Sequence, residues 1–76
     1  MDYLANNIKY LRKKRGIKQK VMAKDIHVCF RTVQSWESGV SAPTLACLIL
    51  LEKELQIDLN SLVHKNLEEE DEKNTV

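Results

Sequence analysis

The chain has 76 residues and a mass of 8.8 kDa, which allows one small domain and leaves no room for a separate catalytic domain. Its composition is 43% apolar and 30% charged with two glycines and one proline, which favours a compact helical protein and excludes collagen-like and wholly disordered chains. The net charge of +1 is the sum of two opposite parts. Residues 1–65 hold eleven Lys/Arg and six Asp/Glu, whereas residues 66–76 hold one Lys and five Asp/Glu. We therefore expect a basic domain over residues 1–65 and an acidic tail over residues 66–76.

Two cysteines, Cys29 and Cys47, are too few for the disulfide framework of a small secreted domain, and they favour a reducing cytoplasm. The N-terminal residues lack a basic flank followed by an apolar run, and no stretch approaches the roughly 18 apolar residues of a membrane span. His27 and His64 do not form the closely spaced pairs of a zinc site with these cysteines. We expect a cytoplasmic protein that needs no metal or cofactor.

Helical periodicity begins at the N-terminus. The first predicted helix covers residues 2–15, with Asp2 as its cap and Gly16 at its end. One face of it carries residues at helical spacing: Leu4, Ile8, Leu11 and Arg15. The second predicted helix, residues 19–26, is about two turns long. Three of its apolar residues share the inward face: Met22, Ala23 and Ile26.

The third predicted helix covers residues 29–38, with Val33 and Trp36 inward, and it ends at Gly39. After Pro43, Thr44 can cap a fourth helix that ends near residue 56. The apolar stripe of this fourth helix consists of leucines: Leu45, Leu48, Leu51 and Leu55.

Asp58 can cap a short fifth helix. Three apolar residues of this helix are expected to face inward: Leu59, Leu62 and Val63. The residues from Glu68 onward combine like charges with no apolar periodicity, which predicts a disordered tail. No segment alternates in the manner of a strand, so the fold class is all-α.

The second and third predicted helices are separated by a tight connection over residues 26–28, an arrangement typical of a helix-turn-helix. Basic charge gathers in the same part of the chain, since residues 9–24 contain eight Lys/Arg and no acid. Such a run suits contacts to phosphate, although the same pattern is also found on a solvated helical face. The two features together favour nucleic-acid binding.

Four segments carry a resemblance to a known family. They are I-K-Y-L-R-K-K-R-G-I-K-Q from Ile8, M-A-K-D-I from Met22, V-C-F-R-T-V-Q-S-W-E-S-G from Val28, and P-T-L from Pro43 with the later L-x-x-L-x-x-x-L stripe. In this order and spacing the sequence resembles the lambda-repressor-like, Cro/cI-type helix-turn-helix domains from about Ile8 to Leu62. The resemblance implies a compact five-helix domain whose second and third helices form the helix-turn-helix.

The resemblance also implies a function. A bacterial or phage-like transcriptional regulator, most often a repressor, would bind a palindromic operator in double-stranded DNA as a homodimer, with the third helix in the major groove. The base-reading residues implied by position are Cys29, Phe30, Arg31, Gln34 and Ser35. The phosphate-contacting residues are Gln19, Lys18, Lys20, Arg15 and Ser38.

Other positions carry structural expectations. In the family, residues matching Arg12 and Glu37 tend to form an ion pair that joins the first helix to the end of the third. His27 stands where the family usually has Gly, and a non-glycine residue tolerates positive φ only moderately, so either the turn is slightly strained or its geometry differs. Lys18 and Cys29 replace the usual Ser or Thr caps of the second and third helices, and each replacement weakens capping.

The fourth predicted helix is more apolar than one buried face requires, because residues 45–51 form an unbroken apolar run. We expect some of these side chains to be exposed in a monomer and to contribute to a symmetric dimer. The expected dimer residues are Leu50, Ile57, Leu59 and Val63. No motif of an enzyme is present, and the alternative function is a protein-interaction adaptor or an antitoxin-like partner of another chain.

Overall fold

Residues 3–73 are described by the computed structural model as six helices, and no strand occurs among them. In chain order the helices are α1 (Leu4–Lys14), α2 (Gln19–Asp25), α3 (Phe30–Ser38), α4 (Leu45–Leu55), α5 (Leu59–His64) and α6 (Leu67–Lys73). The first five follow the predicted helices, and the predicted all-α fold is confirmed. The cap expected at Asp2 lies outside the described residues, and Tyr3 occupies the N-cap position of α1. None of the helices in the described range is long and apolar enough to cross a membrane.

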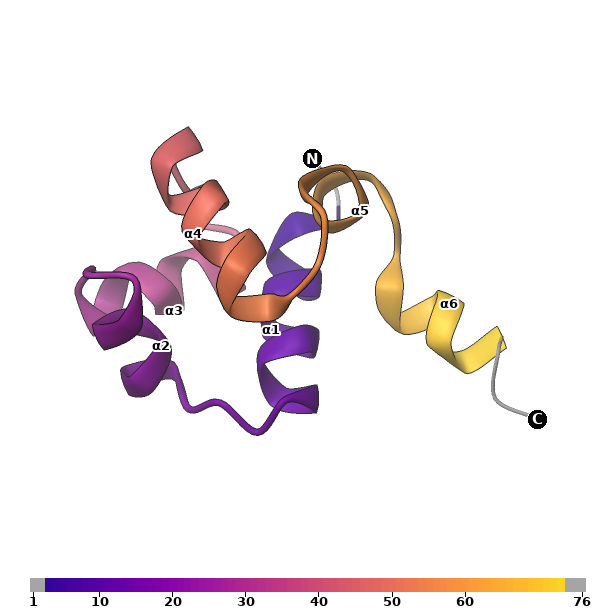
Figure 1. Ribbon diagram of the computed structural model, residues 1–76, viewed down its shortest axis with the longest axis horizontal. Helices are drawn as coiled ribbons and strands as arrows, with labels where there is room; N and C mark the ends of the chain where they lie inside the picture. The colour runs from indigo at the N-terminus through magenta and orange to yellow at the C-terminus, as the bar shows by residue number, and fades with distance from the viewer. Residues whose placement is uncertain (1–2, 74–76) are drawn as a thin grey trace.

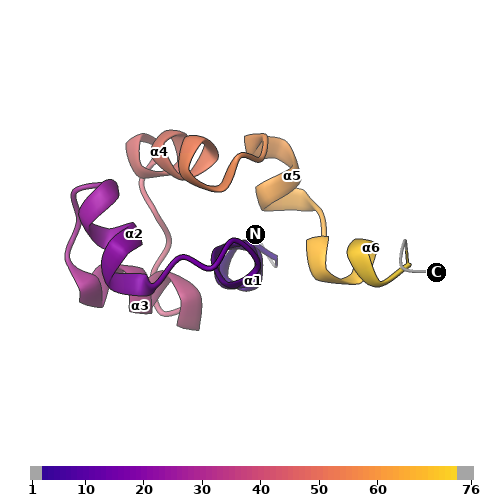
Figure 2. The same cartoon turned by 60° about the horizontal axis from the view of Figure 1, so that its bottom comes forward.

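Helix α1 lies at the centre of the arrangement. The pair α2 and α3 packs on one side of it, α4 crosses above, and α5 leads to α6 at the opposite end (Figures 1 and 2). The core forms where these helices meet, and its members are Leu4, Ile8, Met22, Ala23, Ile26, Val33, Trp36, Leu51, Leu55 and Leu62. Trp36 is buried, so the prediction that it belongs to the core is confirmed.

The turns and caps follow the sequence expectations. His27 has φ +60°, so of the two alternatives the turn keeps the left-handed conformation, and Gly39 ends α3 with φ +80°. A left-handed residue other than glycine costs roughly 1–2 kcal/mol, so the turn between α2 and α3 is slightly strained. Thr44 and Asp58 cap α4 and α5 by accepting from backbone N–H groups. At the starts of α2 and α3 the side chains at the N-cap positions accept no such bond.

Helix α4 differs from its predicted stripe at one end. Leu45 was expected to face inward but is 66% exposed, because it is the first residue of the helix and lies beyond the core that Leu51 and Leu55 enter. Ile49 and Leu50 are also exposed, which confirms that the apolar run supplies more apolar surface than one monomer buries.

The acidic segment also differs from the prediction. Residues 67–73 form helix α6, whereas a disordered tail was expected, and residues 74–76 lie outside the described part of the chain. Leu67 is buried and its N–H donates to the Asn7 Oδ1 of α1 at 3.2 Å, which fixes the start of the helix. Acidic residues in the first turn favour a helix because they face the positive end of its dipole. The like-charge block was therefore insufficient evidence of disorder.

Candidate nucleic-acid interface

Helix α3 presents a polar outer surface beside the N-terminus of α2. Val33 and Trp36 are buried on its inner side, whereas Arg31 and Gln34 are exposed. Phe30 and Ser35 are half-buried on this helix. Cys29 is an exposed free thiol at the N-cap position of α3. The structure thus brings the five predicted base-reading residues together on one helix and its cap.

The side chain of Lys20, in the first turn of α2, reaches the start of α3. The ammonium group of Lys20 lies 5.5 Å from the centroid of the Phe30 ring, within the range of a cation–π interaction. This contact joins a predicted phosphate-contacting residue to a predicted base-reading residue. Lys18, at the N-cap position of α2, is exposed.

A buried ion pair ties α1 to the end of α3. Arg12 Nε donates to Glu37 Oε2 at 2.6 Å and Arg12 Nη2 donates to Glu37 Oε1 at 3.0 Å, with side chains 9% and 4% exposed. The third nitrogen, Nη1, donates to the Ile17 carbonyl at 2.7 Å. Gln19 Nε2 also donates to Glu37 Oε1, at 3.0 Å. One carboxylate therefore connects α1, the start of α2 and the end of α3.

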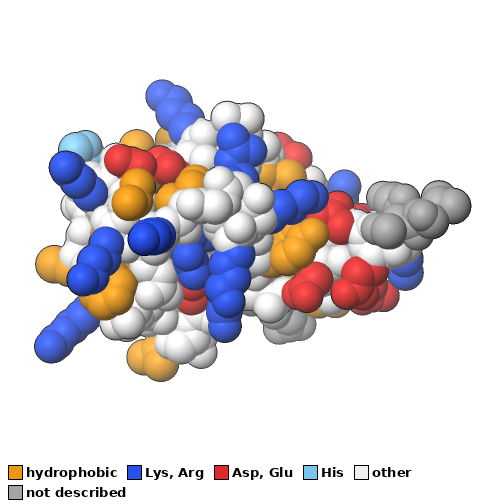
Figure 3. All heavy atoms as spheres, turned by 90° about the horizontal axis from the view of Figure 1, so that it is seen from below, with side chains coloured by type: hydrophobic (Ala, Val, Ile, Leu, Met, Phe, Trp, Pro, Cys, Tyr) orange, Lys and Arg blue, Asp and Glu red, His pale blue; other side chains and the backbone are white. Residues whose placement is uncertain are grey.

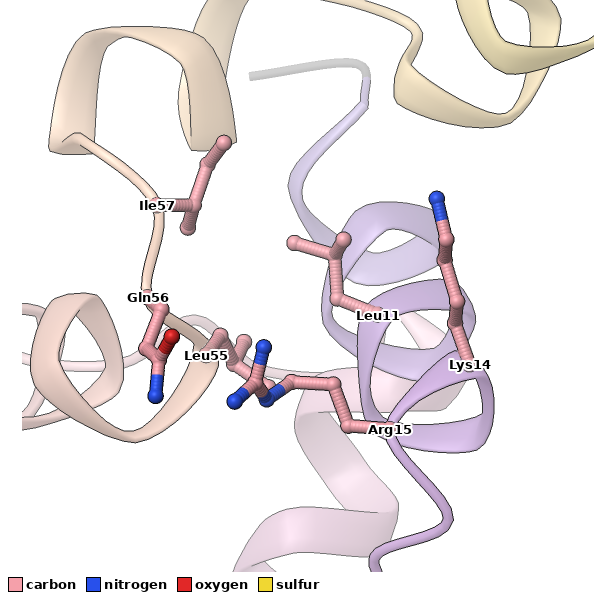
Figure 4. Close-up of a pocket in the computed structure, with 6 residues that line it drawn as sticks. All are labelled: Leu11, Lys14, Arg15, Leu55, Gln56 and Ile57. Carbon is pink, nitrogen blue, oxygen red and sulfur yellow. The ribbon is translucent and has the colours of Figure 1, made fainter.

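Two other predicted phosphate-contacting residues have partners within the protein. Arg15 extends toward the end of α4 and lines a groove of about 370 Å³ with Leu11, Leu55 and Ile57 (Figure 4). Burial and the Asp25 carboxylate raise the pKa of Glu54, and the Arg15 guanidinium partly offsets that rise. Ser38 is exposed and its hydroxyl donates to the Ser35 carbonyl at 3.2 Å.

Charge is divided along the molecule. Lys and Arg side chains are spread over the face seen in Figure 3, and acidic side chains gather toward the end formed by α6. The two regions meet where Lys14 donates to Asp71 Oδ2 at 2.6 Å and the Tyr10 hydroxyl donates to the same oxygen. These two donors hold the pKa of the Asp71 carboxyl below its usual value. The acidic helix thus neutralises part of the basic surface of α1.

Some functional contacts escaped the sequence reasoning. The buried Asn7 side chain donates to the carbonyls of Leu62 and Lys65 at 2.7 and 2.6 Å, and so fixes α5 and the start of α6 against α1. The sequence signal for this contact was the position of Asn7 between Leu4 and Ile8, on the apolar face of α1. The bond between Gln19 and Glu37 had no comparable signal, because their side-chain contact depends on how three helices meet.

The predicted dimer residues lie on and around α4 and α5. Leu50 is exposed, whereas Ile57, Leu59 and Val63 are half-buried. Ile57 and Val63 also pack against the core of the monomer. Within the described residues, no group of three or more His, Cys, Asp or Glu side chains is arranged to hold a metal ion.

Comparison with known proteins agrees with this architecture. A family model described as "Helix-turn-helix" matches residues 8–62, and no curated protein matches the chain. The fold is similar to the P22 c2 repressor protein in complex with synthetic operator 9T in the presence of Tl+, with TM-score 0.78 and 27% identity over 87% of this chain and 98% of that one.

A second solved structure, a transcriptional regulator from Listeria innocua, gives TM-score 0.73 and 26% identity over 93% of this chain and 72% of that one. The family and fold are those of DNA-binding regulators, which are not enzymes. With most of its length matched by the family model, the chain belongs to the Cro/cI-type helix-turn-helix family.

Proposed function

We propose that this protein is a sequence-specific regulator of transcription that binds double-stranded DNA and acts as a repressor in the cytoplasm. The observation that carries the proposal is the exposed polar surface of α3 beside the basic start of α2, in a fold similar to a repressor bound to an operator. An α-helix fits the major groove of B-DNA, where each base pair presents a distinct set of donors and acceptors. In this proposal α3 enters that groove.

Sequence reading is assigned to α3 and its cap. Arg31 can donate two hydrogen bonds to guanine O6 and N7, a contact worth roughly 1–3 kcal/mol against a wrong base. Gln34 can pair with adenine, and Phe30 can contact a thymine methyl group. Cys29 and Ser35 flank these residues and complete the base-reading set.

Contacts to the DNA backbone are assigned to the start of α2 and the end of α3. At the start of α2, phosphate would be contacted by Gln19, Lys18 and Lys20. At the end of α3 it would be contacted by Ser38. Arg15 belongs to the same predicted set, although its side chain extends toward α4 in the free protein. These contacts fix the position of the protein on DNA and make binding dependent on salt.

A homodimer on a palindromic operator completes the proposal. The exposed Leu50 and the half-buried Ile57, Leu59 and Val63 would form the symmetric interface. Two recognition helices would then lie about 34 Å apart, one turn of DNA. Sedimentation at micromolar concentration tests this arrangement, and a monomer both free and on DNA contradicts it.

Selection of bound sequences from random duplex DNA tests the function as a whole. Enrichment of a palindrome supports the regulator. On the enriched duplex, Arg31→Ala should relax the preference at one base position in each half-site. Lys20→Ala should weaken binding to all sequences by a similar factor and flatten the salt dependence. Equal effects of the two substitutions would contradict the assigned roles.

A second function is a protein-interaction adaptor or an antitoxin-like partner. The acidic α6 and the loop over residues 40–43, which lacks Lys and Arg, favour this alternative. The absence of any enriched sequence at low salt would support it over the regulator.

A further inference from the structure

The side-chain amide of Gln19 is already hydrogen-bonded within the free protein. Gln19 is the first residue of α2 and its side chain is not free in solvent, since Nε2 donates to Glu37 Oε1 at 3.0 Å. The orientation of the amide follows from chemistry, because a carboxylate only accepts hydrogen bonds and must face the nitrogen of the amide and not its oxygen.

Glu37 is itself held firmly. Its side chain is only 4% exposed, and both carboxylate oxygens accept from Arg12 at 2.6 and 3.0 Å. Arg12 is fixed in turn by its bond to the Ile17 carbonyl, at 2.7 Å, in the connection that leads into α2. The acceptor that orients Gln19 therefore belongs to a buried network and not to a mobile surface side chain.

An amide nitrogen carries two N–H groups, and the bond to Glu37 uses one of them. We propose that Glu37 is a positioning residue for DNA binding, because it orients Gln19 so that the second N–H is presented to a phosphate at the start of α2. This inference rests on the proposed function and assigns to Glu37 a role beyond its ion pair. Fixing the side chain in advance reduces the conformational entropy lost on binding.

A double-mutant cycle tests the coupling between the two residues. In Glu37→Gln the side chain keeps one acceptor oxygen for three donors, two from Arg12 and one from Gln19, so Gln19 loses its fixed orientation. The dissociation constant is measured on the duplex enriched by selection, or on a random duplex at low salt if none is enriched. Urea denaturation first establishes that each variant is folded in the binding buffer.

Gln19→Ala should weaken binding about fivefold in the natural background, the effect of one lost hydrogen bond, and less than about twofold in the Glu37→Gln background. Gln34→Ala is the matched control, because it removes an exposed glutamine from α3. Its effect should be the same in both backgrounds. Multiplicative effects of the Gln19 and Glu37 substitutions would overturn the proposal. A protein that binds no duplex would instead overturn the proposed function.

If Glu37→Gln does not fold, the side-chain NH2 signals of Gln19 in the unaltered protein provide the test. Two separate proton signals are expected in the free protein, and on addition of the duplex one should shift strongly while the other keeps its position. Two signals that both stay unchanged, or that move equally, would overturn the positioning role.

Discussion

Removal of the acidic segment should strengthen binding to DNA of random sequence. Residues 68–76 carry five acidic residues and one lysine, so their deletion raises the net charge from +1 to +5. Leu67 remains in place and continues to fill its site in the core. The deletion also releases Lys14 from Asp71, which adds one cation to the surface available to phosphate.

The size of the effect follows from the dimensions of the molecule. Its longest extent is 38 Å, so we take about 20 Å as the separation between α6 and the nearest phosphates. Two unit charges at about 20 Å interact by about 0.2 kcal/mol in water. Four net charges facing about three phosphates then give about 1 kcal/mol at 10 mM salt, where the Debye length is about 30 Å. At 150 mM salt, with a Debye length of about 8 Å, screening removes most of this repulsion.

The assay is the dissociation constant for a random duplex at both salt concentrations. We expect the deletion to tighten binding about fivefold at 10 mM salt and by less than about twofold at 150 mM. Asp71→Asn alters the contacts with Lys14 and Tyr10, and Glu70→Gln, an exposed change on the same helix, removes the same charge without those contacts. Asp71→Asn should have the larger effect. Unchanged affinity after the deletion at low salt would refute the reasoning and reduce the segment to a feature of solubility.

Three further predictions concern stability and are tested by urea denaturation. Cys29→Ser should raise the free energy of unfolding by about 0.5–1 kcal/mol, because serine supplies the cap that α3 lacks, and no change would show that the cap position tolerates a thiol. Thr44→Ala should lower it by about 1 kcal/mol through loss of the bond to the Cys47 N–H, and a smaller loss would mean that water replaces the cap. Partial burial and the nearby Asp25 carboxylate raise the pKa of Glu54, so its ionised form disfavours the folded state at neutral pH. Stability should therefore rise as the pH falls through that raised pKa toward the ordinary glutamate value of 4.5, and Glu54→Gln should add a few tenths of a kcal/mol at pH 7 and abolish the rise. A destabilised variant would show that the attraction of Glu54 to Arg15 dominates.

The helices were predictable because their signals are local. The spacing of Leu51 and Leu55, the cap residues Thr44 and Asp58, and the glycine after α3 each act within a turn or two of the chain. At His27 the resemblance left two alternatives, a slightly strained turn or a different geometry, and the structure has the left-handed conformation.

The contacts that failed prediction depend on distant parts of the chain. Helix α6 is fixed by Leu67 and by Asn7, whose side chain reaches residues about sixty positions away. A block of like charges indicates that a segment is exposed to solvent. It does not show whether a neighbouring basic helix neutralises those charges. The outward position of Leu45 has the same origin, because periodicity defines a face of α4 but not where the core beneath that face ends.

The basic run itself overstates the charge available to DNA. Of the eight Lys/Arg between residues 9 and 24, Arg12 is buried with Glu37 and Lys14 is paired with Asp71. The other six are exposed: Lys9, Lys13, Arg15, Lys18, Lys20 and Lys24.

Each phosphate contact contributes about −0.9 to the slope of log K against log salt concentration, so six contacts from this run limit its contribution to about −5.4 for one protomer on a random duplex. Deletion of residues 68–76 should steepen the slope by at least about 0.3, the change that corresponds to a fivefold effect at 10 mM salt and a less than twofold effect at 150 mM, whereas Glu70→Gln should change it much less. A slope near −7 for the unaltered protein would show that the internal ion pairs open on DNA, and the electrostatic division between α1 and α6 would then hold only in the free protein.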